Sequence, residues 1–410
     1  YTDYFIEKDL PLPREMQEYR SHIARIASAH HRPNENSLLE MAVSIADRLS
    51  SGLDRIPEED NESQLGFRES RLLSIFDEIE LINHQFKSPG TAFHKLVPLE
   101  SGDERIFPEI GSPQGSPQEY VQLFNQFLPE LNKINPDLNF QFYIDGLISL
   151  LERYTWCIPS SAYKTLPDVS LFDHAFSTAS IAQALYIYHS QNGSVPTWGD
   201  ERGKFILMGG DLSGIQDYIF GISRNSGRGV SKIFRARSFY LQALTRSVLI
   251  DIQNRLDLLS VCRLIDTGGK FILLLPATNS TKSKLNALDE DIQLWFRRKF
   301  KGRLTLNLSW STEIGQQDFH LKNFQSSVNA VNESIEESKL HKLQRTFAVQ
   351  GPLIDEDYDE NEGGNCALCN VNAADRQSSE KYEAEEGLSI PICPDCCDQI
   401  TYLGKRLPVT

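Results

Sequence analysis

The stretch FILMGGDLSGIQDYIF, residues 205–220, predicts a strand that passes through a glycine-rich turn into a helix. Residues 205–208 are all apolar, as in a buried strand. Three glycines follow that let a backbone turn tightly or lie close to a ligand: Gly209, Gly210 and Gly214. Asp211 is therefore expected where the strand ends. Ser213 is a candidate N-cap, because apolar residues recur at helical spacing after it.

This glycine-rich turn has two interpretations. A carboxylate at a strand end, beside the exposed N–H groups of a helix N-terminus, suits a metal-bound phosphate, because those groups and the helix dipole favour anions. The alternative is a structural turn that binds nothing, and the residue types alone favour it.

A second stretch, RLIDTGGKFILLLP at residues 263–276, predicts a hairpin of two strands around a two-glycine turn. Palm-type nucleotidyl cyclases and polymerases place a Gly-Gly-Asp hairpin beside a strand-end Asp, so that two carboxylates share Mg²⁺ ions. Here Gly268 and Gly269 are followed by Lys270, which cannot ligate a metal. A two-metal site would be incomplete, so the hairpin is expected to contact a nucleotide or to act as a scaffold.

Four motifs in this order resemble one known family. They are DVSLFDHAFSTASIAQALY at residues 168–186, GDLSGIQDYIF at 210–220, FRARSFYLQALT at 234–245 and TGGKFILLLP at 267–276. Together they resemble the region around the first palm of the large signature subunit of type III CRISPR effector complexes, most closely the Csm-type (III-A) form. The resemblance extends from about residue 28 to residue 403.

The resemblance implies an activity for the complete subunit: on binding of target RNA to its complex, it converts ATP with Mg²⁺ or Mn²⁺ into cyclic oligoadenylate messengers. The implied partners are the other protein subunits, the guide CRISPR RNA and the target RNA, with single-stranded DNA as a further substrate. The family's catalytic Gly-Gly-Asp-Asp hairpin belongs to a second palm, and no such tetrad occurs in these 410 residues. This palm is then expected to be non-catalytic.

In that interpretation the first palm forms one wall of an ATP site. The residues expected to contact the nucleotide are Asp211, Ser213, Gly214, Ile215, Gln216, Gly268, Gly269 and Lys270, the last through phosphate. Two rival functions remain open. One is a stand-alone nucleotidyl cyclase or polymerase, which would need a second carboxylate near Asp211. The other is a non-enzymatic scaffold of a ribonucleoprotein complex.

The overall composition limits the class of protein. At 410 residues the chain can form two to four domains. Its net charge of −15 argues against indiscriminate nucleic-acid binding. Two basic runs, residues 223–237 and 297–303, are either solvated faces or, for the first, a loop near polyphosphate or RNA. With no long apolar run and no leader in view, we expect a cytoplasmic protein with no membrane partner.

The cysteines cluster near the end of the chain. Two CxxC pairs, Cys366 with Cys369 and Cys393 with Cys396, are separated by 23 residues, which is typical of a structural Zn²⁺ site. Redox and iron–sulfur sites are the alternatives. Cys397 is expected to point away from the metal. We assign residues 351–410 to a small zinc module of treble-clef or ribbon type.

The N-terminal part is expected to be helical. Helices over residues 19–29 and 38–49 would bring His30 and His31 close to Asp47, as in the divalent-metal site of HD-type phosphohydrolases. A helix cap or a polar surface is the alternative. HHRP and ADRLSSG resemble the second half of the family's HD nuclease domain, but its leading His and His-Asp motif is absent. We therefore expect no single-stranded DNase activity from this chain. The neighbouring Asp173 and His174 are expected to make structural hydrogen bonds.

The sequence thus predicts a multidomain α+β protein. The expected domains are a partial HD-type helical domain at 1–110, a palm with preceding helices at 119–350 and the zinc module at 351–410. The palm is expected to be ferredoxin-like, with helices on one face of the sheet. Its expected strands are 205–210, 261–265, 270–276 and 303–310, and its expected helices are 214–222, 236–256 and 283–300. An amphipathic helix over 323–344 follows, whose outer face could meet a partner.

Overall fold

The computed structural model describes residues 2–54, 69–78, 92–161, 167–221, 230–351 and 364–407. Residues 223–229 of the first basic run lie outside the described residues, whereas residues 230–237 belong to a helix.

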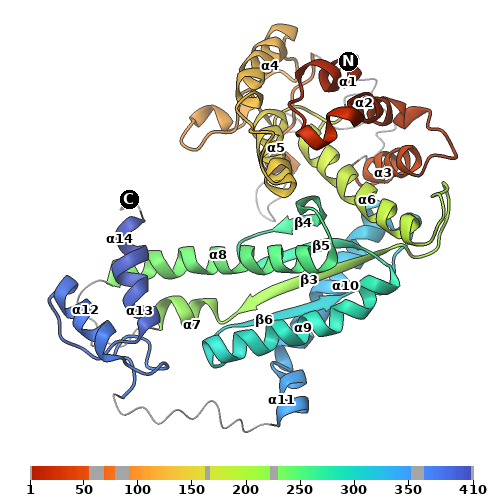
Figure 1. The fold of residues 1–410 in the computed structure, drawn as a ribbon. Helices are drawn as coiled ribbons and strands as arrows, with labels where there is room; N and C mark the ends of the chain where they lie inside the picture. The colour runs from red at the N-terminus through yellow and green to blue at the C-terminus, as the bar shows by residue number, and fades with distance from the viewer. Residues whose placement is uncertain are drawn as a thin grey trace.

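A four-stranded antiparallel sheet carries the predicted palm (Figure 1). Its order is β4-β5-β3-β6, formed by β3 (Phe205–Ser213), β4 (Arg263–Asp266), β5 (Lys270–Pro276) and β6 (Thr305–Trp310). The intervening helices are α7 (Ile215–Phe220), α8 (Val230–Leu256) and α9 (Asn279–Phe300). This is the predicted β-α-α-β-β-α-β order, and the predicted strands and the helix α9 are confirmed to within a few residues. Helix α8 begins earlier than predicted, because Lys232 and Arg235 belong to its first turns.

Helices cover both faces of this sheet, so the prediction of helices on one face only is wrong. Side chains alternate between the faces along a strand. Ile206 and Met208 of β3 share a core with α8 and α9. Phe205 and Leu207 share a second core with α3 (Leu38–Asp54), α6 (Leu171–Gln191) and α10 (Leu321–Leu340). The second core joins the N-terminal helices to the palm.

The glycine pair of β3 serves close packing and does not form a turn, which corrects the sequence prediction. The strand continues through Gly209 and Gly210 to Ser213. A Cβ on Gly209 would lie 2.6 Å from Cδ1 of Ile335 in α10, and a Cβ on Gly210 would collide with the ring of Phe271. The turn is made by Gly214, with φ of 92°, and this residue rather than Ser213 is the N-cap of α7.

The remaining N-terminal helices form their own layers. Helix α2 (Arg20–Ser28) runs into the short 3-10 helix η3 (Ala29–His31), and α3 packs along α6. Helices α4 (Pro117–Leu131) and α5 (Phe140–Thr155) share a core with Phe5 and Leu10. The helices expected to precede the palm therefore pack with the N-terminal part, above the sheet in Figure 1.

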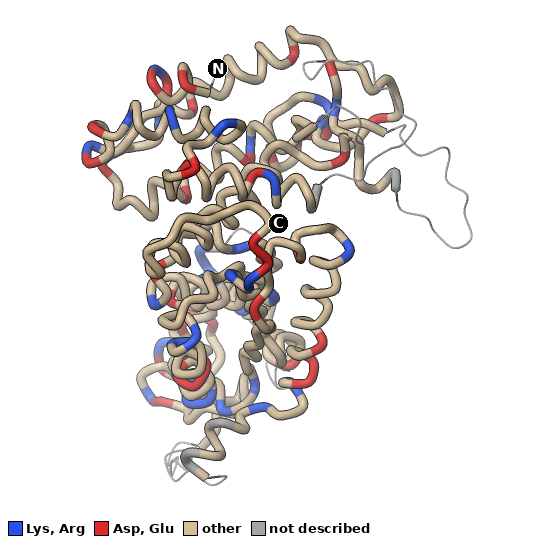
Figure 2. The backbone as a smooth tube through the Cα atoms, turned by 90° about the vertical axis from the view of Figure 1, so that its right-hand side faces the viewer, with Lys and Arg blue, Asp and Glu red and all other residues tan. Residues whose placement is uncertain are grey.

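The C-terminal module contains α12 (Arg376–Glu386), α13 (Pro394–Asp398), the π-helix η10 (Gln399–Leu403) and α14 (Gly404–Arg406). Its core includes Ile233 of α8, so the module lies on the palm (Figure 1). Lys and Arg residues are interspersed with Asp and Glu along the described backbone (Figure 2). Within the described ranges, no helix is long and apolar enough to cross a membrane.

Candidate functional site

The predicted nucleotide-contacting residues meet at one end of the sheet. Asp211 in β3 lies opposite Lys270 of β5 and opposite Asn307 of β6. Asn307 Nδ2 donates to the backbone oxygen of Asp211 and, at 2.9 Å, to Oγ of Ser213. Asp211 points to the face that α10 covers, because it has the same strand parity as Gly209. Both predicted motifs therefore contribute to this end.

A lysine that the sequence analysis missed holds the Asp211 carboxylate. Lys339 Nζ of α10 lies 2.5 Å from Oδ2 of Asp211 and 2.6 Å from Oε1 of Glu336. Partial burial opposes the charge of Lys339, but hydrogen bonds to Asp211 and Glu336 outweigh it and raise the pKa of the ammonium group. Hydrogen bonding to Lys339 in turn lowers the pKa of Glu336.

The hairpin turn lies beside the start of α7. A Cβ on Gly269 would lie 2.9 Å from Cδ1 of Ile215, and the backbone N–H of Leu212 donates to the carbonyl of Gly269 at 2.8 Å. Gly268 has a positive φ of 75°, as the tight turn requires. Gln216 is exposed in α7, which is only six residues long. The strand end can therefore offer two lysines, a carboxylate, an amide and a hydroxyl to a ligand.

A second group of candidates comes together on the N-terminal helices. The ligand atoms of His30, His31 and Asp47 lie within 4.8 Å of one another. Nδ1 of His30 donates to the carbonyl of Ala27 at 2.7 Å, so the lone pair of this imidazole lies on Nε2. The packing of η3 on α3 thus produces the predicted grouping, and it can hold a divalent metal.

His174 joins this group from α6, which the sequence analysis did not anticipate. Its Nε2 donates to Oδ1 of Asp47 at 3.2 Å, and its Nδ1 lies 3.1 Å from Oγ of Ser50. The hydrogen bond from His174 is the main reason why the pKa of Asp47 is lowered. Asp173 instead bonds Ser170, the N-cap of α6. The two neighbours make separate structural hydrogen bonds and no dyad.

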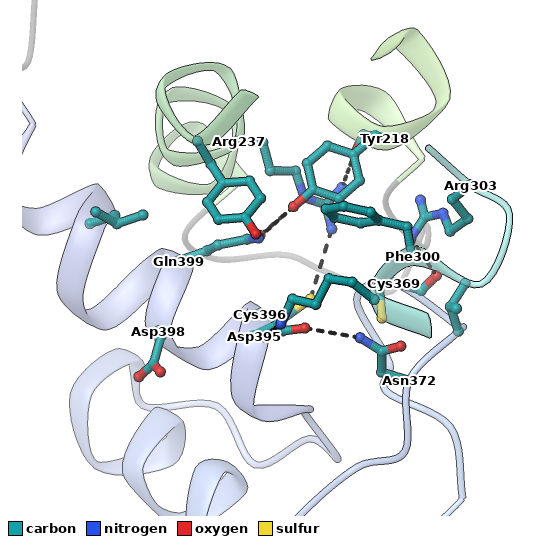
Figure 3. Close-up of a pocket in the computed structure, with 14 residues that line it drawn as sticks. Tyr218, Arg237, Phe300, Arg303, Cys369, Asn372, Asp395, Cys396, Asp398 and Gln399 are labelled. Atoms are coloured by element: carbon teal, nitrogen blue, oxygen red, sulfur yellow. Dashed lines mark hydrogen bonds and ion pairs between the residues drawn. The ribbon is translucent and has the colours of Figure 1, made fainter. Parts of the chain in front are cut away.

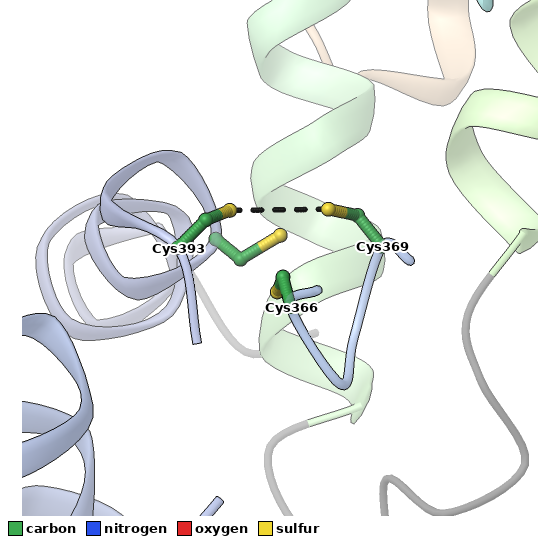
Figure 4. Close-up of side chains that lie close together, drawn as sticks. Cys366, Cys369 and Cys393 are labelled. Atoms are coloured by element: carbon green, nitrogen blue, oxygen red, sulfur yellow. Dashed lines mark hydrogen bonds between the residues drawn. The ribbon is translucent and has the colours of Figure 1, made fainter. Parts of the chain in front are cut away.

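The four predicted cysteines form a buried cluster (Figure 4). All four Sγ atoms lie within 4.8 Å, and those of Cys369 and Cys393 are 3.8 Å apart. A tetrahedral ion with Zn–S bonds of about 2.3 Å would separate its sulfurs by about 3.8 Å, so the donors fit such an ion. The first pair lies on a turn at Asn370, with φ of 56°, whereas the second lies where α13 begins.

The neighbouring thiol is directed elsewhere, as predicted. Cys397 Sγ lies 3.9 Å from Oγ1 of Thr401 and is not part of the four-sulfur cluster. In the cluster, hydrogen bonds from the other thiols, Cys366 first, raise the pKa of Cys396. Four thiols this close oppose joint ionisation, which a bound cation would relieve. Cys157 and Cys262, which lie outside the cluster, are also buried.

The palm matches a described protein domain. Residues 204–350 match the family model described as Csm1 subunit domain B. The chain is therefore related to the large subunit of type III CRISPR effector complexes, which confirms the resemblance carried by the four motifs.

The curated relatives are of subtype III-A. A CRISPR system single-strand-specific deoxyribonuclease Cas10/Csm1 (subtype III-A) from Methanocaldococcus jannaschii is 28% identical over 424 residues, covering 93% of this chain and 50% of the relative. The protein of the same description from Enterococcus italicus is 28% identical, covering 78% of this chain and 44% of its own. The chain thus spans about half, or less, of the length of these relatives.

Solved structures share the fold. A Csm1-Csm4 cassette in complex with cA3 aligns with a TM-score of 0.61 at 22% identity, covering 83% of this chain and 45% of that chain. Csm1 of T. onnurineus aligns with a TM-score of 0.56 at 25% identity, covering 73% and 38%. The mixed helix-and-sheet fold of this chain is therefore that of Csm1.

Proposed function

We propose that this chain is part of the large subunit of an RNA-guided type III CRISPR interference complex. It supplies a non-catalytic palm of ferredoxin-like type, an HD-type helical part and a zinc module. The packing supports a boundary later than the sequence predicted, with the helical part extending through α6 and the palm beginning near residue 204. The complete subunit then makes cyclic oligoadenylates from ATP with Mg²⁺ or Mn²⁺, beside other Csm-type subunits, guide RNA and target RNA.

One observation carries the non-catalytic role of this palm. Two-metal catalysis needs carboxylates that share the ions. Here Asp211, two residues before the end of β3, is paired with the ammonium of Lys339, and the residue opposite it in β5 is Lys270. Two lysines suit contact with a polyphosphate instead of with a metal. This palm then forms one wall of a composite ATP site with a second palm.

Relatives of the same fold support the nucleotide assignment. Csm1-Csm4 cassettes similar to this chain have been solved in complex with one ATP and with cA4. By analogy, we propose that this palm contacts ATP through Asp211, Ser213, Gly214, Ile215, Gln216 and the Gly268–Lys270 turn. Lys339, which pairs with Asp211, is a further candidate for contact with the nucleotide.

Complementation tests this function. The chain is incubated with ATP and Mg²⁺ or Mn²⁺, alone and with the C-terminal half and the RNA-bound complex, and cyclic oligoadenylates are measured by mass spectrometry. Product only in the complemented reaction is the expected result. Product from the chain alone would overturn the non-catalytic role, and no product in any mixture would favour the scaffold.

The zinc module has a separate test. We propose that Cys366, Cys369, Cys393 and Cys396 bind one structural Zn²⁺. Cys396→Ser should release zinc in elemental analysis, whereas Cys397→Ser, one residue away, should retain it. Equal zinc content in the two variants would contradict the assignment of Cys396 as a zinc ligand.

A metal-dependent single-strand nuclease is the second candidate function, favoured by the grouping of His30, His31 and Asp47. A divalent metal at these residues would activate water for phosphodiester hydrolysis. Mn²⁺ titration of the wild type against Asp47→Asn tests the metal site, and a single-stranded DNA cleavage assay tests the activity. If the chain bound Mn²⁺ at Asp47 but did not cleave DNA, the metal site would be supported and the nuclease activity would be contradicted.

A further inference from the structure

Arg237 is a fully buried cation at the joint between the palm and the C-terminal module. It lies in the FRARSFYLQALT motif on α8 and is 1% exposed. Its Nη1 donates to the carbonyl of Tyr218 at 2.6 Å, and its Nε donates to Oε1 of Gln399 at 3.3 Å. Its Nη2 lies 3.8 Å from Sγ of Cys396 (Figure 3).

The charge of this guanidinium is not balanced by an acid. Across the described ranges, no carboxylate lies within 4.0 Å of Arg237. A buried charge is strongly unfavourable unless it is paired. Asp395 and Asp398 line the neighbouring cavity, but they pair with Lys299 and Lys381. Of the groups that contact the guanidinium directly, the one that takes negative charge on binding a metal is Cys396 of the four-cysteine cluster.

We propose that Arg237 is the charge partner of the metal-loaded cysteine cluster and thereby couples metal binding to the position of α7. This inference rests on the proposed zinc site. Four thiolates around one divalent ion carry a net negative charge, which compensates the guanidinium. Four neutral thiols would leave the guanidinium uncompensated.

The coupling reaches α7 through Tyr218. The Tyr218 hydroxyl accepts a hydrogen bond from Nε2 of Gln399 at 2.8 Å, and its ring lies 5.2 Å from the guanidinium carbon of Arg237. Arg303 lies against the same ring at 5.9 Å. A cavity of about 230 Å³ lies between the module and the palm at this point, so these polar contacts hold the joint where packing is incomplete.

This arrangement differs from that of a simple docking contact. If Arg237 only attached the module to the palm, its removal would loosen the joint without changing the affinity for metal. If it compensates the cluster, its removal weakens metal binding, and removal of the metal loosens α7. Helix α7 directly follows the GDLSG motif of the palm, so metal binding would also affect the position of the residues proposed to contact the nucleotide.

The test compares two arginines of α8. Zinc affinity is measured by competition with a chromogenic chelator for the wild type, Arg237→Met, Arg237→Lys and Arg235→Met. Arg235 is the matched control, because its Nη2 contacts the module at the carbonyl of Gly404 and not at a sulfur. Loss of an outer-shell partner of a metal site typically costs about 10–100-fold in affinity, so Arg237→Met should show such a loss. Arg237→Lys should lose less, and Arg235→Met should resemble the wild type.

A second measurement covers the case in which Arg237→Met does not fold. Hydrogen exchange of residues 215–220 is followed in the wild-type chain with zinc and after chelation. Faster exchange after chelation is expected. Unchanged exchange, or equal zinc affinity in Arg237→Met and Arg235→Met, would overturn the coupling. A wild type that binds no zinc would instead overturn the zinc site itself.

Discussion

Lys339 Nζ lies 2.5 Å from the Asp211 carboxylate because α10 packs directly against β3. Val331 and Ile335 of α10 contact the space where a side chain of Gly209 would stand. Residues four apart lie on one face of a helix, so the same face carries Lys339 one turn further on. The glycine that admits the helix therefore also places its lysine on the neighbouring carboxylate.

Replacing Lys339 tests the strength of this pair. Lys339→Met should lower the free energy of unfolding by about 1 kcal/mol at neutral pH, the upper range for partly exposed ion pairs. Because the pKa of Lys339 is raised in the folded state, its contribution is complete below the unfolded pKa of about 10.4 and is lost as pH rises through the folded pKa. Urea unfolding from pH 7 to 11 measures both effects. Lys322→Met, exposed on the same helix, is the control, and a loss of stability at pH 7 no larger for Lys339→Met than for Lys322→Met would contradict the ion pair.

Gly210 should tolerate no side chain. Gly210→Ala places a Cβ against the Phe271 ring within the sheet, so we expect a loss of about 2 kcal/mol in unfolding free energy. Gly111→Ala, where no atom lies within 4 Å of the added Cβ, is the matched control. Phe271→Leu in the Gly210→Ala background should recover part of the loss in a double-mutant cycle. If the losses caused by Gly210→Ala and Phe271→Leu were additive, the Phe271 ring would not be the group that excludes a side chain at position 210.

The sequence predicted most of the palm because its signals are local. Apolar runs, the two-glycine turn of 268–269 and helical spacing each fix an element from neighbouring residues. The glycines of β3 were misinterpreted because a glycine permits a turn and a close contact equally well. Only Ile335 and Phe271, distant in sequence, decide between the two.

The same reasoning explains which site residues were found. The cysteines were predicted because each CxxC pair is a local metal ligand pattern, and His30 and His31 adjoin each other in sequence. Lys339 and His174 were missed because tertiary packing alone brings them to Asp211 and Asp47. A signal for Lys339 did exist, in the four-residue spacing of Val331, Ile335 and Lys339 opposite a strand glycine.

A buried histidine at the end of α6 should make the fold sensitive to mild acid. His189 is 2% exposed, and burial, with Lys204 nearby, lowers its pKa to about 4. Between pH 6.5 and 4 the unfolded chain binds a proton that the folded chain does not. The free energy of unfolding should therefore decrease by about 3 kcal/mol as the pH is lowered across this window. The Asp200 carboxyl beside Lys204 titrates below this pH window, because a hydrogen bond from Arg202 lowers the pKa of Asp200.

Unfolding by urea at pH 4 to 7 measures this dependence. His189→Gln should flatten it, whereas a replacement of the exposed His341 by Gln should leave it unchanged. An equal slope in wild type and His189→Gln would assign the acid sensitivity to other groups.

The last prediction concerns His174 and the metal affinity of the N-terminal group. His174 donates to Oδ1 of Asp47 and is itself held by Ser50, so it fixes the direction of the carboxylate. Outer-shell partners of this kind contribute about 10–100-fold to metal affinity, and His174→Ala should weaken Mn²⁺ binding by that factor. Titration followed by electron paramagnetic resonance of free Mn²⁺ measures it.

Two variants separate positioning from ligation in this experiment. His22→Ala on α2 removes an exposed histidine that hydrogen-bonds Arg25 and is not one of the three grouped residues, and should leave Mn²⁺ affinity unchanged. Asp47→Asn keeps the side-chain shape but removes the charge, and should abolish binding. If His174→Ala bound Mn²⁺ as tightly as the wild type, the Asp47 carboxylate would be oriented by α3 alone. The contact between α3 and α6 would then serve only the core that joins the helical part to the palm.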